Sequence, residues 1–235
     1  MMTMYAGESK IVGFHSVTLT TPDAAATDRA YHRLFGDSVE AESTTGAIVI
    51  AEGSAAAAAI TFCVDAFAPA VRLLGRRGIE LTVQGDRAVA TVHGVGLGIA
   101  PTKPRPVPPS DLAGIDHVVY VSANPDCAVA TLGAQLGLDL RLDRTQINGL
   151  RQLFFRCGDG LLELLIAGDD PTVDDRVWGI AWRSSDVDRT HARLASAGIE
   201  VSEIRAGRKP GTRVFTIKDT SLVVPTIIIE STPKP

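Results

Sequence analysis

The sequence predicts an α+β protein built from repeated βαβββ units. Two sequence repeats support this: residues 194–201 (LASAGIEV) resemble residues 74–81 (LGRRGIEL), and residues 114–119 (GIDHVV) resemble residues 12–17 (VGFHSV). Repeats of this kind indicate that one supersecondary unit has been copied. A third observation is the proline-rich stretch over residues 101–109. Such a stretch forms neither a helix nor a central strand, so it divides the chain into two halves.

The C-terminal half shows the unit most clearly. β-branched residues predict a strand over residues 116–122, and Asn124 with Pro125 begins a helix that Gly137 ends. Three strands should follow, the last two joined by a Gly-Asp-Gly turn, over residues 139–145, 151–156 and 161–166. The same order then repeats, with a strand over 177–183, a helix over 186–197, and strands over 200–205, 213–218 and 226–230.

The N-terminal half shows the same plan in a shorter form. Its first unit is expected to contain a strand over residues 11–20, a helix over 23–34, and strands over 39–42 and 46–51. Its second unit contains a strand over 57–64, a helix that ends at residue 77, and strands over 80–83, 88–92 and 96–100. The spacing of the repeats makes the first unit shorter by about one strand and its turn.

Composition excludes several classes of protein. The chain has 235 residues, 45% of them hydrophobic, and a net charge of −4, which is typical of a globular protein and not of a nucleic-acid binder. No apolar run is long enough to span a bilayer, and the N-terminus lacks a signal-peptide core. The scattered Cys63, Cys127 and Cys157 favour a reducing cytoplasm and buried thiols. We expect a cytoplasmic protein without a nucleic-acid or membrane partner.

His-Val-Val on the first strand of the third unit and Glu-Leu-Leu on its fourth strand, at residues 117–119 and 163–165, resemble the vicinal oxygen chelate superfamily of glyoxalases, bleomycin-resistance-like proteins and extradiol dioxygenases. The resemblance implies the glyoxalase-like fold, in which paired units form cup-shaped mixed sheets with helices outside. It implies a degenerate domain at residues 10–101 with a truncated first unit, a proline-rich linker at 102–111, and a second domain at 112–232 that carries the candidate site.

The resemblance also implies a divalent metal ion, with ligands from the first and fourth strands of each unit. His117 and Glu163 match two of these positions, whereas the fifth-strand position falls on Gly179. The eighth-strand position falls on Ile228 or Glu230, which strand alternation places on one face. His117, Glu163 and Glu230 would suit a divalent ion that acts as a Lewis acid. The residues do not distinguish zinc, nickel, manganese, iron and magnesium, and no nucleotide cofactor is expected.

The N-terminal half matches less well. His15 occupies the first-strand position, but the remaining positions fall on apolar or small residues near Ile48, Thr61 and Gly98. One histidine alone cannot hold a metal ion. The resemblance therefore implies that this half is a non-catalytic partner of the second.

A metal-free polar pocket is the alternative. A carboxylate such as Glu163 in an apolar strand needs a partner, and Arg151, Arg183 and Arg213 are candidates that would also orient an anionic substrate. Without a metal ion, Glu163 or Glu230 would act as a general base. Gly179, which has no side chain, would let a substrate approach the floor of the cup.

Two functions follow from these alternatives. The first is a lyase- or isomerase-type enzyme that acts on a small oxygenated or anionic metabolite in the C-terminal cup. The second is a protein that binds a hydrophobic or antibiotic-like ligand without turnover. Extradiol dioxygenase activity is not expected, because the triad of two histidines and one carboxylate is missing. We expect a monomer or a weak homodimer, and a site completed by a partner subunit is a third alternative.

Overall fold

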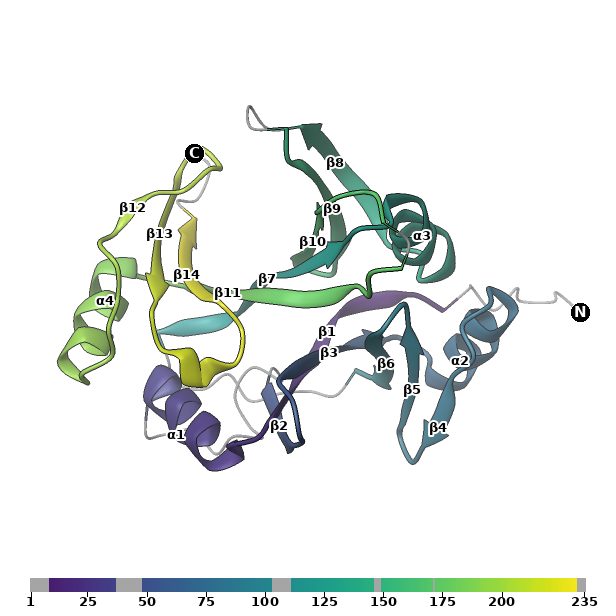
Figure 1. Ribbon diagram of the computed structural model, residues 1–235, viewed down its shortest axis with the longest axis horizontal. Helices are drawn as coiled ribbons and strands as arrows, with labels where there is room; N and C mark the ends of the chain where they lie inside the picture. The colour runs from purple at the N-terminus through teal and green to yellow at the C-terminus, as the bar shows by residue number, and fades with distance from the viewer. Residues whose placement is uncertain (1–8, 37–47, 103–110, 146–148, 171, 232–235) are drawn as a thin grey trace, which may run out of the picture.

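The computed structural model describes residues 9–36, 48–102, 111–145, 149–170 and 172–231. The strands of these residues form two mixed sheets, one from each half of the chain, with the main helices on the outside (Figure 1). The predicted α+β fold of two curled mixed sheets is therefore confirmed. Among the described residues, none of the helices combines the length and the apolar character that a membrane crossing requires.

The first sheet has the strand order β2-β1-β3-β6-β5-β4. At its centre β1 pairs antiparallel with β3. β2 pairs parallel with β1, and β6 pairs parallel with β3. The predicted strand at residues 39–42 lies outside the described residues. The elements of this half are β1 (Ile11–Thr21), α1 (Ala24–Phe35), β2 (Ile48–Glu52), β3 (Ala57–Val64), α2 (Phe67–Arg76), β4 (Thr82–Gln84), β5 (Arg87–Val92) and β6 (Val95–Pro101).

The second sheet has the order β12-β13-β14-β11-β7-β10-β9-β8. Its central strands β7 and β11 are antiparallel, and the two ends of the sheet rise on either side of them (Figure 1). The elements are β7 (Leu112–Ser122), α3 (Pro125–Val129), the π-helix η1 (Ala130–Gln135), β8 (Asp139–Thr145), β9 (Arg151–Cys157), β10 (Gly160–Ile166), β11 (Arg176–Ser184), α4 (Val187–Ser196), β12 (Arg205–Ala206), β13 (Thr212–Ile217), the 3₁₀-helix η2 (Thr220–Leu222) and β14 (Thr226–Ser231).

Local signals determine where the helices of this half begin. The side chain of Asn124 accepts a hydrogen bond from Cys127 N at the start of α3, and Asp186 accepts one from Arg189 N at the start of α4. Two expectations are corrected. The helix after Asn124 turns π-helical from Ala130 onward, and the strand expected over residues 200–205 is reduced to a bridge at Val201 and the short β12.

Alternation along the strands separates a helix-covered face from a concave face in the second sheet. Val118, Tyr120, Leu162 and Leu164 are fully buried in one core with Leu132 of η1 and Leu194 of α4. The residues that alternate with them along the strands, which include His117 and Glu163, face the other side, which these helices do not cover. Cys63 and Cys157 are buried, as predicted, whereas Cys127 is half-buried. Burial raises the pKa of the Cys157 thiol.

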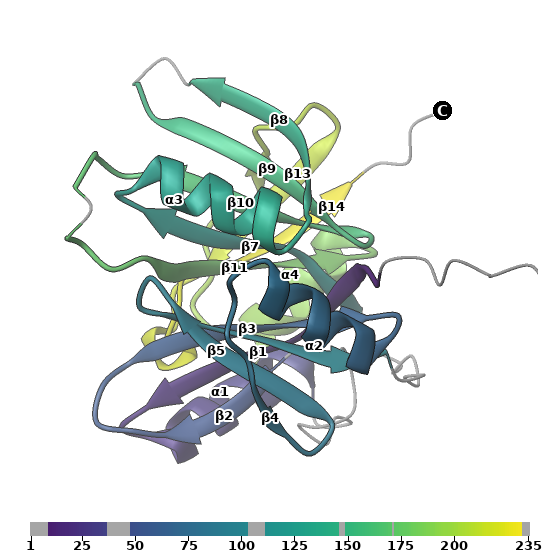
Figure 2. The same ribbon diagram turned by 90° about the vertical axis from the view of Figure 1, so that its right-hand side faces the viewer.

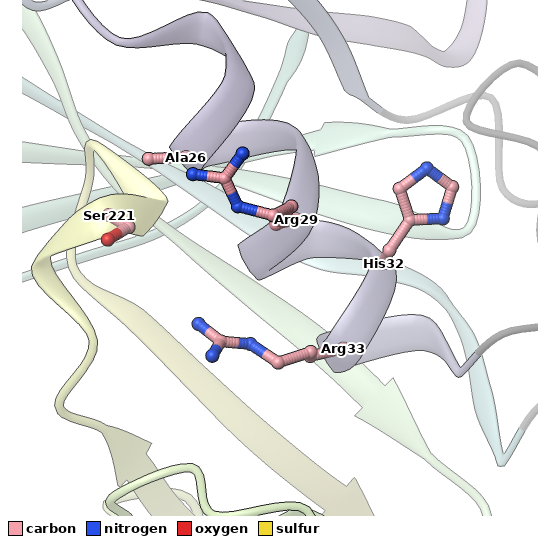
Figure 3. A pocket seen from close by; sticks show the side chains of 5 residues that line it. All are labelled: Ala26, Arg29, His32, Arg33 and Ser221. Carbon is pink, nitrogen blue, oxygen red and sulfur yellow. The ribbon is translucent and has the colours of Figure 1, made fainter.

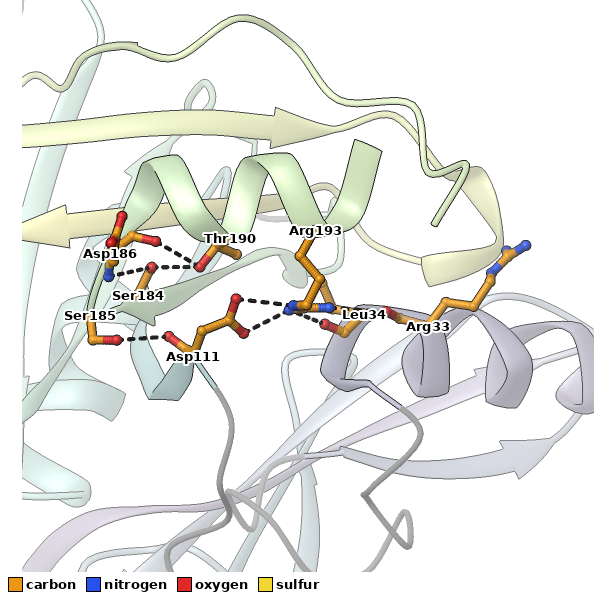
Figure 4. Close-up of polar contacts among 8 residues, drawn as sticks. All are labelled: Arg33, Leu34, Asp111, Ser184, Ser185, Asp186, Thr190 and Arg193. Atoms are coloured by element: carbon orange, nitrogen blue, oxygen red, sulfur yellow. Dashed lines mark hydrogen bonds and ion pairs between the residues drawn. The ribbon is translucent and has the colours of Figure 1, made fainter. Parts of the chain in front are cut away.

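The two halves pack against each other through α1 and through the strands β3 and β11 (Figure 2). The Phe35 ring stacks edge-on against Trp182 of β11 with centroids 4.8 Å apart, and Tyr31 Oη donates to the Leu222 carbonyl. Burial raises the pKa of Tyr31, which therefore stays a neutral donor. Arg193 of α4 reaches the Leu34 carbonyl at the end of α1 (Figure 4). The first half therefore supports the central strands of the second.

Candidate functional site

His117 and Glu163 lie together on the concave face of the second sheet. They come from the neighbouring parallel strands β7 and β10, and His117 Nε2 lies 3.6 Å from Glu163 Oε2. Only 15% of the His117 side chain and 12% of the Glu163 side chain are exposed. The sequence predicted this pair, and the structure brings it together.

Asp116 orients the imidazole from its other side. Asp116 Oδ1 lies 2.9 Å from His117 Nδ1, so a proton on Nδ1 is donated to this carboxylate. Arg183 also contacts Asp116, with Nε 3.4 Å from Oδ2, and pairs with Asp159 at 3.0 Å. Burial alone would raise the pKa of Asp116, but the hydrogen bond and charge of His117, together with Arg183, hold it below its usual value. Arg183 therefore belongs to the site, although it acts through Asp116.

Gln152 holds the Glu163 carboxylate from the neighbouring strand β9. Its amide Nε2 donates to Glu163 Oε1, and its Oε1 accepts from Arg144 Nε at 3.2 Å. Gln152 is 1% exposed, which makes it one of the few buried polar side chains of this sheet. Sequence reasoning missed Asp116, Gln152 and Arg144. The β9–β10 hairpin pairs Cys157 with Gly160 and could have revealed Gln152, because this register places the even-numbered residues of β9 on the face of Glu163.

The structure does not bring the other predicted site residues to this face. Glu230 lies directly opposite Arg213 on the β13–β14 pair, with 3.7 Å between their charged atoms. Arg213 in turn makes two contacts of 2.6 and 2.7 Å with Asp188 of α4. Glu230 and Arg213 therefore lie on the helix-covered face. Arg151 also points away from Glu163, because it alternates with Gln152 and pairs with Asp143 at 2.6 Å.

The register of β14 explains the displacement of Glu230. Ala181 of β11 lies opposite both His117 and Ile227, and it packs in a small cluster with Ile227 and Ile229. The concave face of β14 thus carries Ile227 and Ile229. Ile228 lies opposite the buried Trp182 on the other face, so neither eighth-strand candidate faces His117.

A divalent metal ion, which the fold family implies, does not fit these side chains. His117 and Glu163 supply two ligands, and the described part of the chain holds no group of three or more histidine, cysteine, aspartate or glutamate side chains placed to bind one ion. At the fifth-strand position, a Cβ on Gly179 would lie 2.9 Å from the Pro225 carbonyl oxygen. The close approach of the Pro225 backbone therefore explains why this position is a glycine, and a need for space beside a substrate does not.

The N-terminal sheet has a different centre. His15 is 8% exposed, and its Nδ1 lies 3.2 Å from Ser16 Oγ. Ser16 pairs across the sheet with Thr61, which lies beside Gly98, and Ile48 pairs with Val17. These positions carry the apolar or small residues that the sequence placed there, and none of the three supplies a carboxylate.

An open hollow of about 500 Å³ lies elsewhere, between α1 and η2. Arg29 and Arg33 extend toward the same side as Ser221, whereas His32 points away from them (Figure 3). Asp219 already pairs with Arg33 at 2.9 Å, and Asp28 lies 3.5 Å from His32. Nearby acids thus offset much of the positive charge of this hollow, which contains none of the His117 site.

Comparison with known families agrees with the fold. Residues 114–222 match the Glyoxalase/Bleomycin resistance protein/Dioxygenase superfamily. The C-terminal half of the chain belongs to this superfamily. His117 and Glu163 both lie inside the matched segment. No curated protein sequence matches the chain.

Solved structures extend the likeness in fold to both halves. A fusion protein of a xylose isomerase-like TIM barrel and a 4-hydroxyphenylpyruvate dioxygenase matches 97% of this chain with a TM-score of 0.75 and 14% identity. The chain spans 50% of that protein. A halotolerant catechol dioxygenase matches with a TM-score of 0.73 and 12% identity, over 94% of this chain and 87% of that one. A catechol 2,3-dioxygenase matches with a TM-score of 0.70 and 16% identity, over 96% and 95% of the two chains. At such identities the likeness shows the fold alone.

Proposed function

We propose that the C-terminal sheet carries the site of a metal-independent isomerase- or lyase-type enzyme, which removes a proton from carbon beside a carbonyl group of a small oxygenated or anionic metabolite. The observation that carries this proposal is the 3.6 Å approach of His117 Nε2 to Glu163 Oε2 on the concave face. A base and a hydrogen-bond donor at this spacing can act on neighbouring atoms of one substrate.

Glu163 is the base in this proposal. Gln152 occupies Oε1, which leaves Oε2 directed toward His117. Oε2 takes the proton, and the electron pair of the carbon–hydrogen bond moves toward the carbonyl oxygen to form an enolate. In an α-hydroxy carbonyl compound, Oε2 returns the proton to the former carbonyl carbon while the hydroxyl proton moves to the enolate oxygen, which gives an isomer. Expulsion of a group from the next carbon gives an elimination product.

His117 is the donor that stabilises the enolate oxygen. In its protonated form, Nδ1–H donates to Asp116 and Nε2–H is presented beside Glu163. Asp116 fixes the orientation of the ring, as carboxylates do for catalytic histidines in general. Arg183 adds to the effect of His117 in keeping Asp116 ionised, so its role is to position and not to touch substrate.

The proposal is tested by deuterium exchange. The wild-type chain is incubated in D₂O with pyruvate, 2-oxobutyrate and phenylpyruvate, and loss of the proton signal beside the carbonyl group is followed by NMR. Glu163→Gln should slow exchange by about a hundredfold or more, since a positioned general base contributes about that much. Glu203→Gln, at an exposed glutamate, is the matched control and should exchange like wild type. Equal rates in Glu163→Gln and wild type would refute the proposal.

A binding protein without turnover is the second candidate. The apolar Val119, Leu161 and Leu165 surround His117 and Glu163 on the same face, and such a lining favours retention of an apolar ligand. Saturable binding of a ligand that shows no exchange, and that binds equally well to Glu163→Gln, would favour this candidate over the enzyme.

A further inference from the structure

We infer that Arg144 is the anion-binding residue of this site, and that the ligand is a carboxylate with a flat apolar body. The inference rests on the proposed function for the place of the ligand, on the concave face beside Glu163. It adds a chemical class of ligand and a residue that selects it.

Two contacts hold the Arg144 guanidinium in place. Its Nε donates to Gln152 Oε1 at 3.2 Å, and its Cζ lies 5.2 Å from the centre of the Phe154 ring. Arg144 also faces Gln152 directly across the β8–β9 pair. An arginine that is stacked and hydrogen-bonded in this way loses little further entropy when it binds an anion.

Among the residues that the structure describes, no neighbouring acid neutralises the charge of Arg144. Asp143 is occupied by Arg151 at 2.6 Å, and Asp139 pairs with Arg141 at 3.3 Å. Within the described ranges, no carboxylate forms an ion pair with Arg144, and its two terminal nitrogens have no hydrogen-bond acceptor. These two nitrogens form the planar fork that binds a carboxylate through two parallel hydrogen bonds.

Arg144 is linked to the proposed base, Glu163, through the side chain of Gln152. Gln152 accepts from Arg144 and donates to Glu163, so one amide spans the distance between the guanidinium and the carboxylate. Phe154, on which Arg144 stacks, lies opposite Glu163 across the β9–β10 pair. A ligand whose carboxylate meets Arg144 would therefore extend along Phe154 toward Glu163.

Apolar side chains on this part of the sheet define the rest of the ligand. Leu142 of β8 lies opposite Phe154 and is 46% exposed, although it is a large hydrophobic side chain. Leu165 of β10 lies opposite Gln152 and is half-buried. Together with Phe154 they form an apolar strip beside the cation. A carboxylate attached to an aromatic or other flat apolar group matches this combination.

The inference is tested by isothermal titration calorimetry of the full chain with benzoate, phenylacetate and 3-phenylpropionate, and with their uncharged amides. Arg144→Gln should weaken carboxylate binding by about tenfold to a hundredfold, which corresponds to loss of a charge-assisted hydrogen-bond pair. Binding of the amides should hardly change. Arg144→Lys keeps the charge without the planar fork, so its carboxylate affinity should lie between those of wild type and Arg144→Gln.

Arg151→Gln is the matched control, because Arg151 lies on the same β8–β9 hairpin but pairs with Asp143 on the other face. It should bind the carboxylates like wild type, and melting temperatures verify that every variant is folded. Equal carboxylate affinity in Arg144→Gln and wild type, an equal loss in Arg151→Gln, or no saturable binding of any carboxylate to the wild type up to about 10 mM would each overturn the inference.

The exchange and binding experiments distinguish failure of the proposed reaction from failure of the proposed ligand class. Carboxylate binding that depends on Arg144, without deuterium exchange in any compound, would refute the proposed reaction and leave the ligand class standing. Exchange that depends on Glu163 and keeps its KM in Arg144→Gln would support the reaction and refute the role of Arg144.

Discussion

Replacing Arg193 by methionine should destabilise the protein by removing the contact that joins α4 to the first half of the chain. Arg193 donates to Asp111 at 2.7 and 3.0 Å, and to the Leu34 carbonyl at 3.0 Å (Figure 4). Burial would raise the pKa of Asp111, but Arg193 lowers it below its usual value. The Asp111 carboxylate is therefore ionised, and Arg193 is the cation that balances its charge.

The magnitude follows from the exposure of the two side chains. Only 9% of the Asp111 side chain is exposed, against 32% for Arg193. Breaking a fully buried pair costs about 3–5 kcal/mol because one charge is left without a partner. Since Arg193 is partly in contact with water, we expect the free energy of unfolding to fall by about 3 kcal/mol. For a chain of this length that loss lowers the melting temperature by roughly 6–12 °C.

Urea unfolding followed by tryptophan fluorescence measures this change, because the buried Trp182 packs on Phe35 at the same junction. Arg213→Met is the matched control: Arg213 also pairs twice with an aspartate of α4, but both partners are exposed, so its effect should be much smaller. Asp111→Asn should recover part of the loss when it is combined with Arg193→Met. A destabilisation no larger than that of Arg213→Met would refute the reasoning.

Gly158→Ala should lower the free energy of unfolding by about 1–3 kcal/mol, because a Cβ there would collide with the Val12 carbonyl oxygen. Gly211→Ala has a similarly positive φ but open surroundings, so it should lower the free energy less, as thermal unfolding would show. The stability difference between wild type and Asp116→Asn should be complete above the ordinary carboxyl pKa of about 4. It should shrink as the pH falls through the lowered pKa of Asp116, as urea unfolding at several pH values would show. Manganese and zinc should shift the melting temperatures of wild type and His117→Ala equally, and a shift that His117→Ala abolishes would reveal a metal site.

The unit order was predictable from sequence because each βαβββ unit carries its own local signals. Asn124 and Asp186 begin their helices through side-chain hydrogen bonds that involve residues three positions away. The strand expected over residues 200–205 had no such local determinant. Its pairing depends on distant partners, and only Val201 and the short β12 find them.

The candidate site was predictable only where one strand alone determined it. The resemblance to the superfamily pointed to His117 and Glu163 through His-Val-Val on β7 and Glu-Leu-Leu on β10. Glu230 was misplaced because its face depends on the register between β11 and β14, and a shift of one residue moves every side chain to the other face. Arg151 was misplaced for the same reason, since the hairpin pairs Glu163 with Phe154 and not with an odd-numbered residue of β9.

The two halves carry histidines at matching positions, and the surroundings of these two histidines differ. Near His15, a Cβ on Gly98 would already lie 3.1 Å from Thr61 Oγ1 and 3.2 Å from the Ala88 carbonyl oxygen, so the centre of the first sheet has little room for a larger side chain. Near His117, by contrast, Asp116, Glu163 and the buried amide of Gln152 form one continuous polar network. The first half contributes instead through Phe35, which packs on Trp182 directly behind Ala181, the residue opposite His117. Through this contact the first half packs behind β11, the strand on which Ala181 lies opposite His117.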